Sequence, residues 1–285
     1  MVGHDPFKSY LEDDAPDWKD NLVFTNDSIV LGHDQRIARI TSFERLLQTL
    51  GNSESWFAHP SHWDDPYDSA FMKVPLKMDN GAFLRHGYGN DYYCQCWCKK
   101  SGESDAMWRI YSPKLVIGGV EDYHGIMIIS DIESVMNSIW DTRDELLQIN
   151  RYYGPIQYVP HDSLLDQDFF GKMIGDAAEV WNTSGLGVVR SMLYKSDAYS
   201  HEHEVRFVAR DALVGPDVPS RKGITVKHLP DFSSIVKELV LDPRCSKDFE
   251  AKAISTLRPY FPPNVAIRKS QLYQLLPRHY RIRGT

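Results

Sequence analysis

The stretch Tyr199–Arg210, YSHEHEVRFVAR, is the clearest strand of the sequence, because charged and apolar positions alternate along it. Successive side chains of a strand point to opposite faces. One face is therefore predicted to carry Glu202, Glu204 and Arg206. The other face is predicted to carry His201, His203, Val205 and Phe207. Two carboxylates and a guanidinium on one face are costly unless they are solvated, paired or functional.

Three interpretations of this strand stay open. The charges form the solvated outer face of an edge strand, or a carboxylate among them stabilises positive charge on a sugar ring. Alternatively, His201 and His203 share a metal ion, since imidazole is a common metal ligand. An HxH pair whose face continues into Val205 and Phe207 is more typical of half-buried structure, so no metal ligand set is assigned.

The segments around this strand predict a mixed order of elements. Strands are expected at 54–59, 91–98, 125–130, 154–160, 236–243 and 264–270, and helices at 106–111, 131–149, 166–182 and 247–261. A Leu-rich helix is expected after an N-cap at Thr41 or Ser42, ending at Gly51. Because strands and helices do not alternate regularly, we predict an α+β fold rather than a doubly wound sheet. Residues 1–34 are expected to be an acidic lead-in, and 35–285 a single compact catalytic domain.

Composition narrows the class of protein. The chain has 285 residues, 42% hydrophobic and 25% charged, and its mean hydropathy is −0.41. No apolar run approaches the roughly 20 residues of a spanning helix, and the first residues lack the apolar core of a secretory signal. We therefore expect a cytoplasmic protein without membrane contact. After Glu250 the sequence has basic residues but no acidic ones. This predicts either a basic C-terminal edge that contacts a nucleic acid or an acidic protein, or a solvated tail.

Several motifs are missing or weak. The sequence has no GxxxxGK[ST] phosphate loop, no GxSxG elbow and no GxGxxG after a strand, which argues against common ATPases, serine hydrolases and Rossmann dehydrogenases. Cys94, Cys96 and Cys98 occupy alternate positions of one predicted strand. Zinc sites usually need two or more residues between paired cysteines. Buried reduced thiols are expected instead.

Two further clusters carry side chains suited to a site. The loop His59–Pro66, HPSHWDDP, follows a predicted strand, where sites tend to lie on a rigid scaffold, although an Asp-Pro turn alone would explain it. In Met107–Tyr111, Trp108 and Tyr111 are three residues apart and are predicted to share a helical face. The pair is either part of the core or a stacking platform for a planar ring.

Taken in order, these motifs resemble a bacterial family of unknown function. The family is typified by a Phe-Asn-Asp-Pro-like loop, a Met-Trp-x-x-Tyr motif and a Glu-x-Glu-x-Arg strand, matched here within residues 36–245. The sequence departs from the family in Asp64, where Asn is usual, and in its long acidic N-terminus. More distantly, the series is similar to ADP-ribosyltransferases, above all to toxin-like enzymes that modify nucleic acids. That similarity implies split mixed β-sheets flanked by helices.

The resemblance also implies roles for individual residues. Glu204 would be the catalytic glutamate, and Glu202 and Arg206 would handle the acceptor. The residues expected to bind NAD are Arg39, Thr41, Trp56, His59, Asp65, Trp108 and Tyr111. Which of Glu202 and Glu204 is catalytic stays open.

The sequence thus predicts an NAD-dependent ADP-ribosyltransferase, a toxin or phage-defence effector that modifies a macromolecule. NAD would be the co-substrate, a nucleic acid (RNA or DNA) is favoured as the acceptor, and an antitoxin protein is a possible partner. Two other classes remain open. One is a metal-dependent nuclease or phosphodiesterase that uses His201, His203 and the loop with His59, His62 and Asp65. The other is an interaction module without enzymatic activity.

Overall fold

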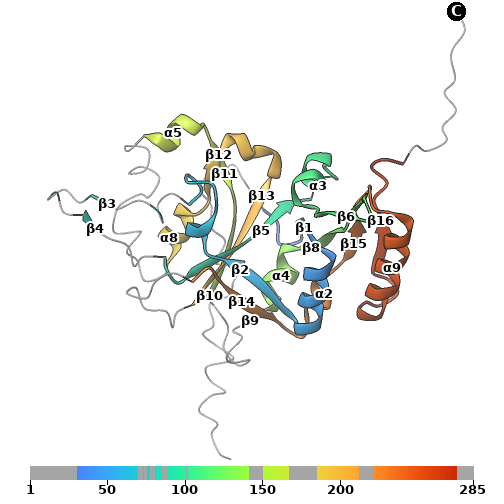
Figure 1. Ribbon diagram of the computed structural model, residues 1–285. Helices are drawn as coiled ribbons and strands as arrows, with labels where there is room; N and C mark the ends of the chain where they lie inside the picture. The colour runs from blue at the N-terminus through green and yellow to red at the C-terminus, as the bar shows by residue number, and fades with distance from the viewer. Residues whose placement is uncertain are drawn as a thin grey trace, which may run out of the picture.

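The computed structural model describes residues 31–69, 73, 76–77, 81, 83–84, 89–100, 102–140, 150–166, 185–211 and 221–274 (Figure 1). Most of the predicted acidic lead-in, the helix predicted over 166–182 (apart from Asp166) and the last eleven residues lie outside these ranges. Leu31, which was assigned to the lead-in, packs into the main hydrophobic core.

Ten strands form one large sheet, which runs in the order β16-β15-β8-β1-β5-β2-β14-β9, with β13 on β5 and β10 on β13. The strands are β1 (Arg36–Ser42), β2 (Glu54–Ala58), β5 (Tyr92–Lys99), β8 (Gly125–Asp131), β9 (Ile139–Trp140), β10 (Asn150–Pro155), β13 (Glu204–Arg210), β14 (Gly223–His228), β15 (Glu238–Leu241) and β16 (Ala266–Lys269). β15 and β16 are parallel and the other pairs antiparallel, so the sheet is mixed.

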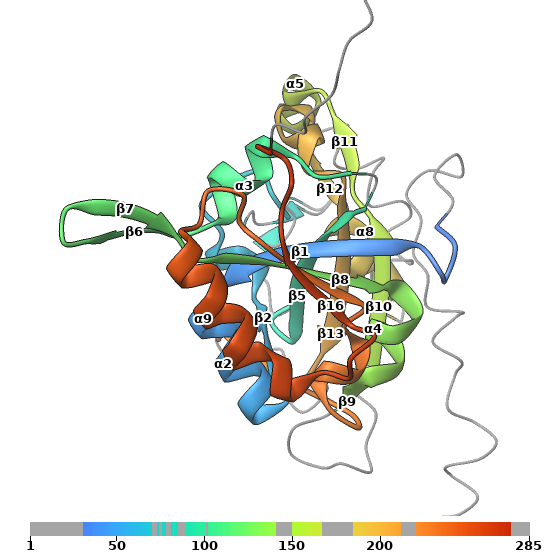
Figure 2. The ribbon, with the colours of Figure 1, turned by 90° about the vertical axis from the view of Figure 1, so that its right-hand side faces the viewer.

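Three two-stranded sheets lie outside the large one. They are β3 (Leu76–Lys77) with β4 (Phe83–Leu84), β6 (Lys114–Ile117) with β7 (Val120–Tyr123), and the parallel pair β11 (Gln157–Val159) with β12 (Tyr194–Ser196). The β6–β7 hairpin projects from the body of the molecule (Figure 2).

The helices in the described part of the chain are short. The α-helices are α2 (Phe43–Asn52), α3 (Asp105–Tyr111), α4 (Ile132–Ser138), α5 (His161–Leu165), α8 (Leu186–Ser191) and α9 (Lys247–Leu257). The 3-10 helices are η2 (Pro60–His62), η4 (Asp197–Glu202), η5 (Phe232–Ile235) and η6 (Arg258–Tyr260). None of these helices has the length and the apolar character needed to span a membrane.

Both faces of the large sheet are packed, as strand β8 shows. Ile126 and Ile128 belong to the main core, whereas Met127 and Ile129 belong to a second cluster around Trp108. This alternation follows the two-residue period of a strand. The main core is covered by α2, α4 and α9, and α2 and α9 lie side by side (Figure 2). On the other face, α3 covers one region and α8 another. The structure thus confirms a mixed α+β fold with a large mixed sheet.

Local signals fix several of the element ends. Ser42 caps α2, because its side chain accepts a hydrogen bond from the backbone N–H of Arg45 (3.1 Å), as one of the two predicted caps should. The helix ends after Asn52 at the left-handed Ser53 rather than at Gly51. The helix predicted over 131–149 ends at Ser138, where β9 begins, and 141–149 lie outside the described residues.

Strand β5 is the branch point of the sheet. Its partner on one side is β13, paired from Glu204↔Cys98 to Arg210↔Tyr92. On the other side β1 pairs only at Ile37 and Ala38, and β2 only at Ala58. Beyond Ala38, β1 therefore diverges from β5, and a cavity opens where the two strands separate.

The stretch Tyr199–Arg210, expected to be one strand, is only partly a strand. β13 begins at Glu204, and residues 197–202 form η4 instead. His203 joins them in the left-handed conformation (φ 45°), which is uncommon for a residue with a side chain. The edge-strand interpretation is also wrong, because β13 lies between β10 and β5 and is buried along nearly its whole length.

Candidate active site

A cavity of about 970 Å³ lies at the branch of the sheet. It is lined by β1, the N-terminus of α2, β2, the loop after η2, β5, α3, β12 and the start of β13. Seven of the ten predicted site residues line it, namely Arg39, Thr41, Trp56, Asp65, Tyr111, Glu202 and Glu204. His59, Trp108 and Arg206 do not line it. The volume lies in the range typical of small-molecule and cofactor sites.

Glu204 is the first residue of β13 and is almost fully buried. Arg206 Nε donates to its Oε1 (2.8 Å) and Lys195 Nζ to its Oε2 (3.2 Å). Burial by itself raises the pKa of Glu204, but the charges of Arg206 and Lys195 outweigh it and hold the pKa well below its usual range. Glu204 is therefore ionised at neutral pH.

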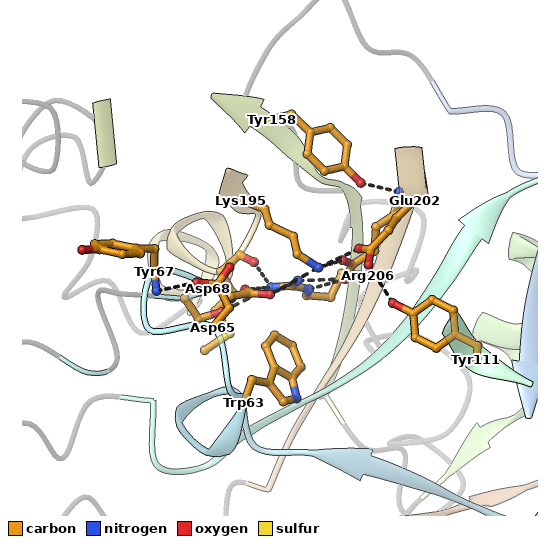
Figure 3. Close-up of polar contacts among 12 residues, drawn as sticks. Trp63, Asp65, Tyr67, Asp68, Tyr111, Tyr158, Lys195, Glu202 and Arg206 are labelled. Carbon is orange, nitrogen blue, oxygen red and sulfur yellow. Dashed lines mark hydrogen bonds and ion pairs between the residues drawn. The ribbon is translucent and has the colours of Figure 1, made fainter. Parts of the chain in front are cut away.

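Glu202, the last residue of η4, lies next to Glu204 because both carboxylates contact Lys195. Lys195 Nζ donates to its Oε2 (2.6 Å) and the Tyr111 hydroxyl to its Oε1 (2.6 Å; Figure 3). Burial, followed by the Glu202 carboxylate, raises the pKa of Tyr111, so the phenol stays protonated and keeps donating. The left-handed His203 lets two carboxylates from different elements meet one ammonium group.

Arg206 has the opposite environment to the one expected of an acceptor-binding residue. Its side chain is 0% exposed. The guanidinium donates to both carboxylate oxygens of Asp68 (3.0 and 3.2 Å), to Ser69 (3.2 Å) and to the Met192 carbonyl. It also lies over the Trp63 ring, 4.5 Å from the centroid (Figure 3). Arg206 cannot touch an acceptor there, and its contacts hold Glu204 and Asp68 in place.

Lys195 and Asp68 are site residues that the sequence analysis missed. Lys195 Nζ is 3.7 Å from Asp68 Oδ2, in addition to its contacts with the two glutamates. Lys195 stands in no recognisable motif, and only its position on β12 brings it to β13. Asp68 lies two residues after the loop His59–Pro66. A candidate loop extended by two residues would therefore have contained it.

Arg39 lines the cavity from the diverging part of β1, which we call the β1 end, as distinct from the β13 end where the carboxylates lie. Among the described residues, no carboxylate forms an ion pair or hydrogen bond with its guanidinium, and the nearby ionisable groups are Cys96, Arg45 and His228. Burial lowers the pKa of Arg39, although an arginine remains charged at any physiological pH. The N-terminus of α2, with Ser42, lies beside it at the cavity wall. Arg39, Arg45 and the N-terminus of α2 make this end suited to an anion, and the one acid of the first turn, Glu44, also lines the cavity.

The aromatic side chains at the cavity differ in exposure. Trp56 and Tyr111 are 50% and 43% exposed and line the cavity, so each presents a ring to a ligand. Trp108 is 0% exposed and packs with Ala38, Met127, Ile129 and Val240. Of the two interpretations of this pair, Trp108 follows the core one, and only Tyr111 at the end of α3 is placed to act as a stacking platform in the cavity.

The loop after β2 combines structural and cavity-facing residues. Asp65 lines the cavity, and its Oδ1 accepts a hydrogen bond from the Tyr67 N–H (2.9 Å), which is the local Asp-Pro turn bond foreseen as the plain alternative. His59 is buried, with one ring nitrogen 3.0 Å from the Gly89 carbonyl and the other 2.7 Å from Ser61. A buried, hydrogen-bonded His59 is not available to NAD.

The histidine and cysteine patterns do not converge on a metal centre. Across the described ranges, no group of three or more His, Cys, Asp or Glu side chains has a geometry that would hold a metal ion. His201 and His203 precede β13, so the two do not share a strand face. The thiols of Cys94, Cys96 and Cys98 line the cavity. Burial raises the pKa of Cys94 and Cys98 to about 12 and that of Cys96 well above its usual value.

No protein-family model matches the chain, and no curated protein matches it. Among solved structures, Thermus sp. 2.9 DarT in complex with NAD+ is similar, with 12% sequence identity and a TM-score of 0.33 over 84% of this chain and 98% of that one. The same DarT in complex with ADP-ribosylated ssDNA has 12% identity and a TM-score of 0.33, over 84% of this chain and 96% of that one. At this distance, the likeness carries no conclusion about activity.

Proposed function

We propose that the protein is an NAD-dependent ADP-ribosyltransferase that modifies a macromolecule. The observation that carries the proposal is the polarity of one cavity, with ionised, internally paired carboxylates at the β13 end and a guanidinium without a described acid partner at the β1 end. NAD has a matching polarity, because its diphosphate is anionic and its nicotinamide ring is cationic.

The residues in the cavity suit the parts of NAD in turn. Arg39 can pair with diphosphate oxygens through its planar fork, next to the helix N-terminus at Ser42. The exposed rings of Trp56 and Tyr111 offer stacking faces for a base or for nicotinamide. Thr41 and Asp65 add polar groups to the wall. Trp108 and His59 are left out of this proposal because both are buried away from the cavity.

The proposed role of Glu204 is electrostatic. Cleavage of the bond between ribose and nicotinamide transfers the bonding electrons to nicotinamide and leaves positive charge on the ribose, as in glycoside hydrolysis. A carboxylate already fixed and ionised stabilises that charge without reorganising. Glu202, which lines the same cavity, would contact the incoming acceptor. Arg206 would act through Glu204 and Asp68 rather than on the acceptor itself.

The acceptor class is a separate part of the proposal. We favour a nucleic acid, in a toxin or defence effector that an antitoxin would restrain. The described part of the basic C-terminal edge adds little to this preference. Arg258 donates to backbone carbonyls, Arg268 pairs with Glu238 and Glu103, and Lys269 donates to the Cys245 carbonyl. These three side chains have partners inside the protein.

The test is incubation of the purified protein with labelled NAD and cell lysate, followed by nuclease or protease treatment of the labelled product. We expect label in a macromolecular fraction that nuclease releases. Label released only by protease would keep the transferase and replace the acceptor class. If calorimetry detects no NAD binding and no label is transferred, the proposal is wrong and an interaction module becomes the better description.

A further inference from the structure

We infer that Lys195 is a positioning residue of the site, whose ammonium group fixes the two glutamates side by side. This inference rests on the proposed function for its kinetic test, but its geometry stands independently. Nζ is 2.6 Å from Glu202 Oε2, 3.2 Å from Glu204 Oε2 and 3.7 Å from Asp68 Oδ2, so one cation is shared by three carboxylates (Figure 3).

A separate small sheet brings Lys195 to this place. Tyr158 on β11 and Lys195 on β12 are direct cross-strand neighbours in the parallel β11–β12 pair. The Tyr158 hydroxyl accepts a hydrogen bond from the backbone N–H of Glu204 (2.8 Å), while Lys195 holds the side chain of Glu204. Two neighbouring residues of this small sheet therefore hold Glu204: Tyr158 bonds its backbone N–H, and Lys195 bonds its carboxylate.

Stability gives little reason for such an arrangement. The Lys195 side chain is only 10% exposed, and those of Glu202, Glu204, Asp68 and Arg206 are less exposed still. Taking charges out of water is costly, and apolar residues of similar volume often serve a fold equally well or better. Asp68, Lys195, Glu202 and Glu204 line the cavity, with Arg206 buried behind them, and such a cluster is what a reaction needs rather than what packing needs.

Every carboxylate oxygen of the two glutamates has one donor. Tyr111 and Lys195 serve the oxygens of Glu202, and Arg206 and Lys195 serve those of Glu204. Lys195 is the donor common to both residues, so it sets their spacing. The groups that surround its ammonium are Glu204 and Arg206 on β13, Glu202 and Tyr199 on η4, Asp68 after η2, Tyr111 on α3, Tyr158 on β11 and Cys98 on β5.

The test compares Lys195→Met and Lys195→Arg with wild type, and uses Lys237→Met as a matched control. Lys237 is also paired with an acid, Asp131 (3.2 Å), but it lies outside the cavity. We expect Lys195→Met to lower kcat for NAD turnover by about 10- to 100-fold, the effect of a small misplacement, and to leave the Kd for NAD within about threefold. Lys195→Arg should recover part of kcat, because it keeps the charge but changes its shape.

The pH profile separates this role from a purely structural one. Glu204 must be ionised to act, and Lys195 is one of the two cations that keep it so. Without Lys195, the acid limb of the kcat profile should move up by about 1 pH unit. The carbon-13 titration of labelled glutamate carboxyls should show the same upward movement without any reaction taking place. Lys237→Met should change neither.

Each outcome decides the inference. A folded Lys195→Met protein with wild-type kcat and acid limb would overturn it, as would a loss confined to NAD affinity. If Lys195→Met does not fold, Lys195→Arg decides: lowered kcat at an unchanged melting temperature supports positioning, and wild-type kcat contradicts it. If wild type itself does not turn over NAD, the proposed function fails, and the carboxyl titration then decides alone whether Lys195 governs the glutamates.

Discussion

At the β13 end of the cavity the charged side chains of Glu202, Glu204, Asp68, Lys195 and Arg206 are all paired within the chain, whereas at the β1 end Arg39 pairs with no described acid. The paired end is a rigid arrangement whose geometry is set before any ligand arrives. The other end has an unmet charge that a ligand can satisfy. Under the proposed function, the β1 end would bind the ligand and the β13 end would take part in the reaction.

The largest expected effect comes from breaking the paired end at its buried centre. Arg206→Met leaves Asp68 and Glu204 without their main cation, and removing one partner of a buried ion pair typically costs about 3–5 kcal/mol. Chemical denaturation should show this loss of unfolding free energy. Arg109→Met is the control, where the solvent-exposed pair with Asp105 should contribute little to stability. Equal losses for both variants would contradict the buried network.

Glu204→Gln should affect reaction more than binding. The amide keeps the shape of the side chain but loses the negative charge, so the rate of ADP-ribose transfer should fall by about 100- to 1000-fold. Affinity for NAD should be little changed, because the contact strengthens only as charge develops on the ribose. Growth toxicity, if the wild type shows it, should disappear. Glu238→Gln, which also alters a glutamate that begins a strand and pairs with an arginine, should transfer normally.

Arg39 tests the unpaired end. Arg39→Ala should weaken NAD binding by about 10- to 100-fold, the usual range for losing hydrogen bonds to a charged group. Arg39→Lys should restore binding only in part, since lysine lacks the planar fork. Calorimetric titration of NAD measures both, with Arg36→Ala, an exposed arginine on the same strand, as the control. Equal affinity of wild type and Arg39→Ala would remove Arg39 from the site.

The smallest effect is expected at the cysteines. Cys96→Ser replaces one small neutral side chain of the cavity wall by another and should leave the transfer rate within about twofold. Burial keeps the cavity thiols protonated, and metal binding requires thiolate. Elemental analysis should therefore find no stoichiometric zinc, and reducing agents should change nothing. One zinc per chain that is lost in Cys96→Ser would refute this view.

Sequence patterns predicted the fold class and six strands of the large sheet, β2, β5, β8, β13, β15 and β16, because these depend on local periodicity, whereas no strand was predicted at β1, β9 or β14. The alternation in β13 and the cap at Ser42 could be identified from a few neighbouring residues. The start of β13 was misplaced because a left-handed residue such as His203 leaves no periodic signal. Glu202 still reached the cavity, although from η4 and not from the same strand face as Glu204.

Which of the candidate side chains line the cavity depends on burial and on contacts between residues distant in sequence, and local patterns do not reveal these. Trp108 and Tyr111 are interchangeable as aromatic residues on a short helix, and only the sheet beneath α3 determines which ring is covered. From the sequence alone Arg206 looks like a surface charge, but in the structure β13 lies between β10 and β5 and the side chain is buried. Lys195 joins the glutamates through the pairing of β11 with β12, which depends on residues distant in sequence.

Because β13 pairs with an antiparallel strand on each side, its register is fixed, and the side chain that it presents to the cavity is the negatively charged Glu204. A slip of two residues would keep each side chain on its face, but it would place Arg206 where Glu204 now stands. Such a misfolded chain would keep apolar side chains on its core face but would present a cation to the ligand. Pairing with β10 on one edge and β5 on the other makes any slip break both ladders at once. Folding fidelity at this strand is thus a condition for the chemistry as well as for stability.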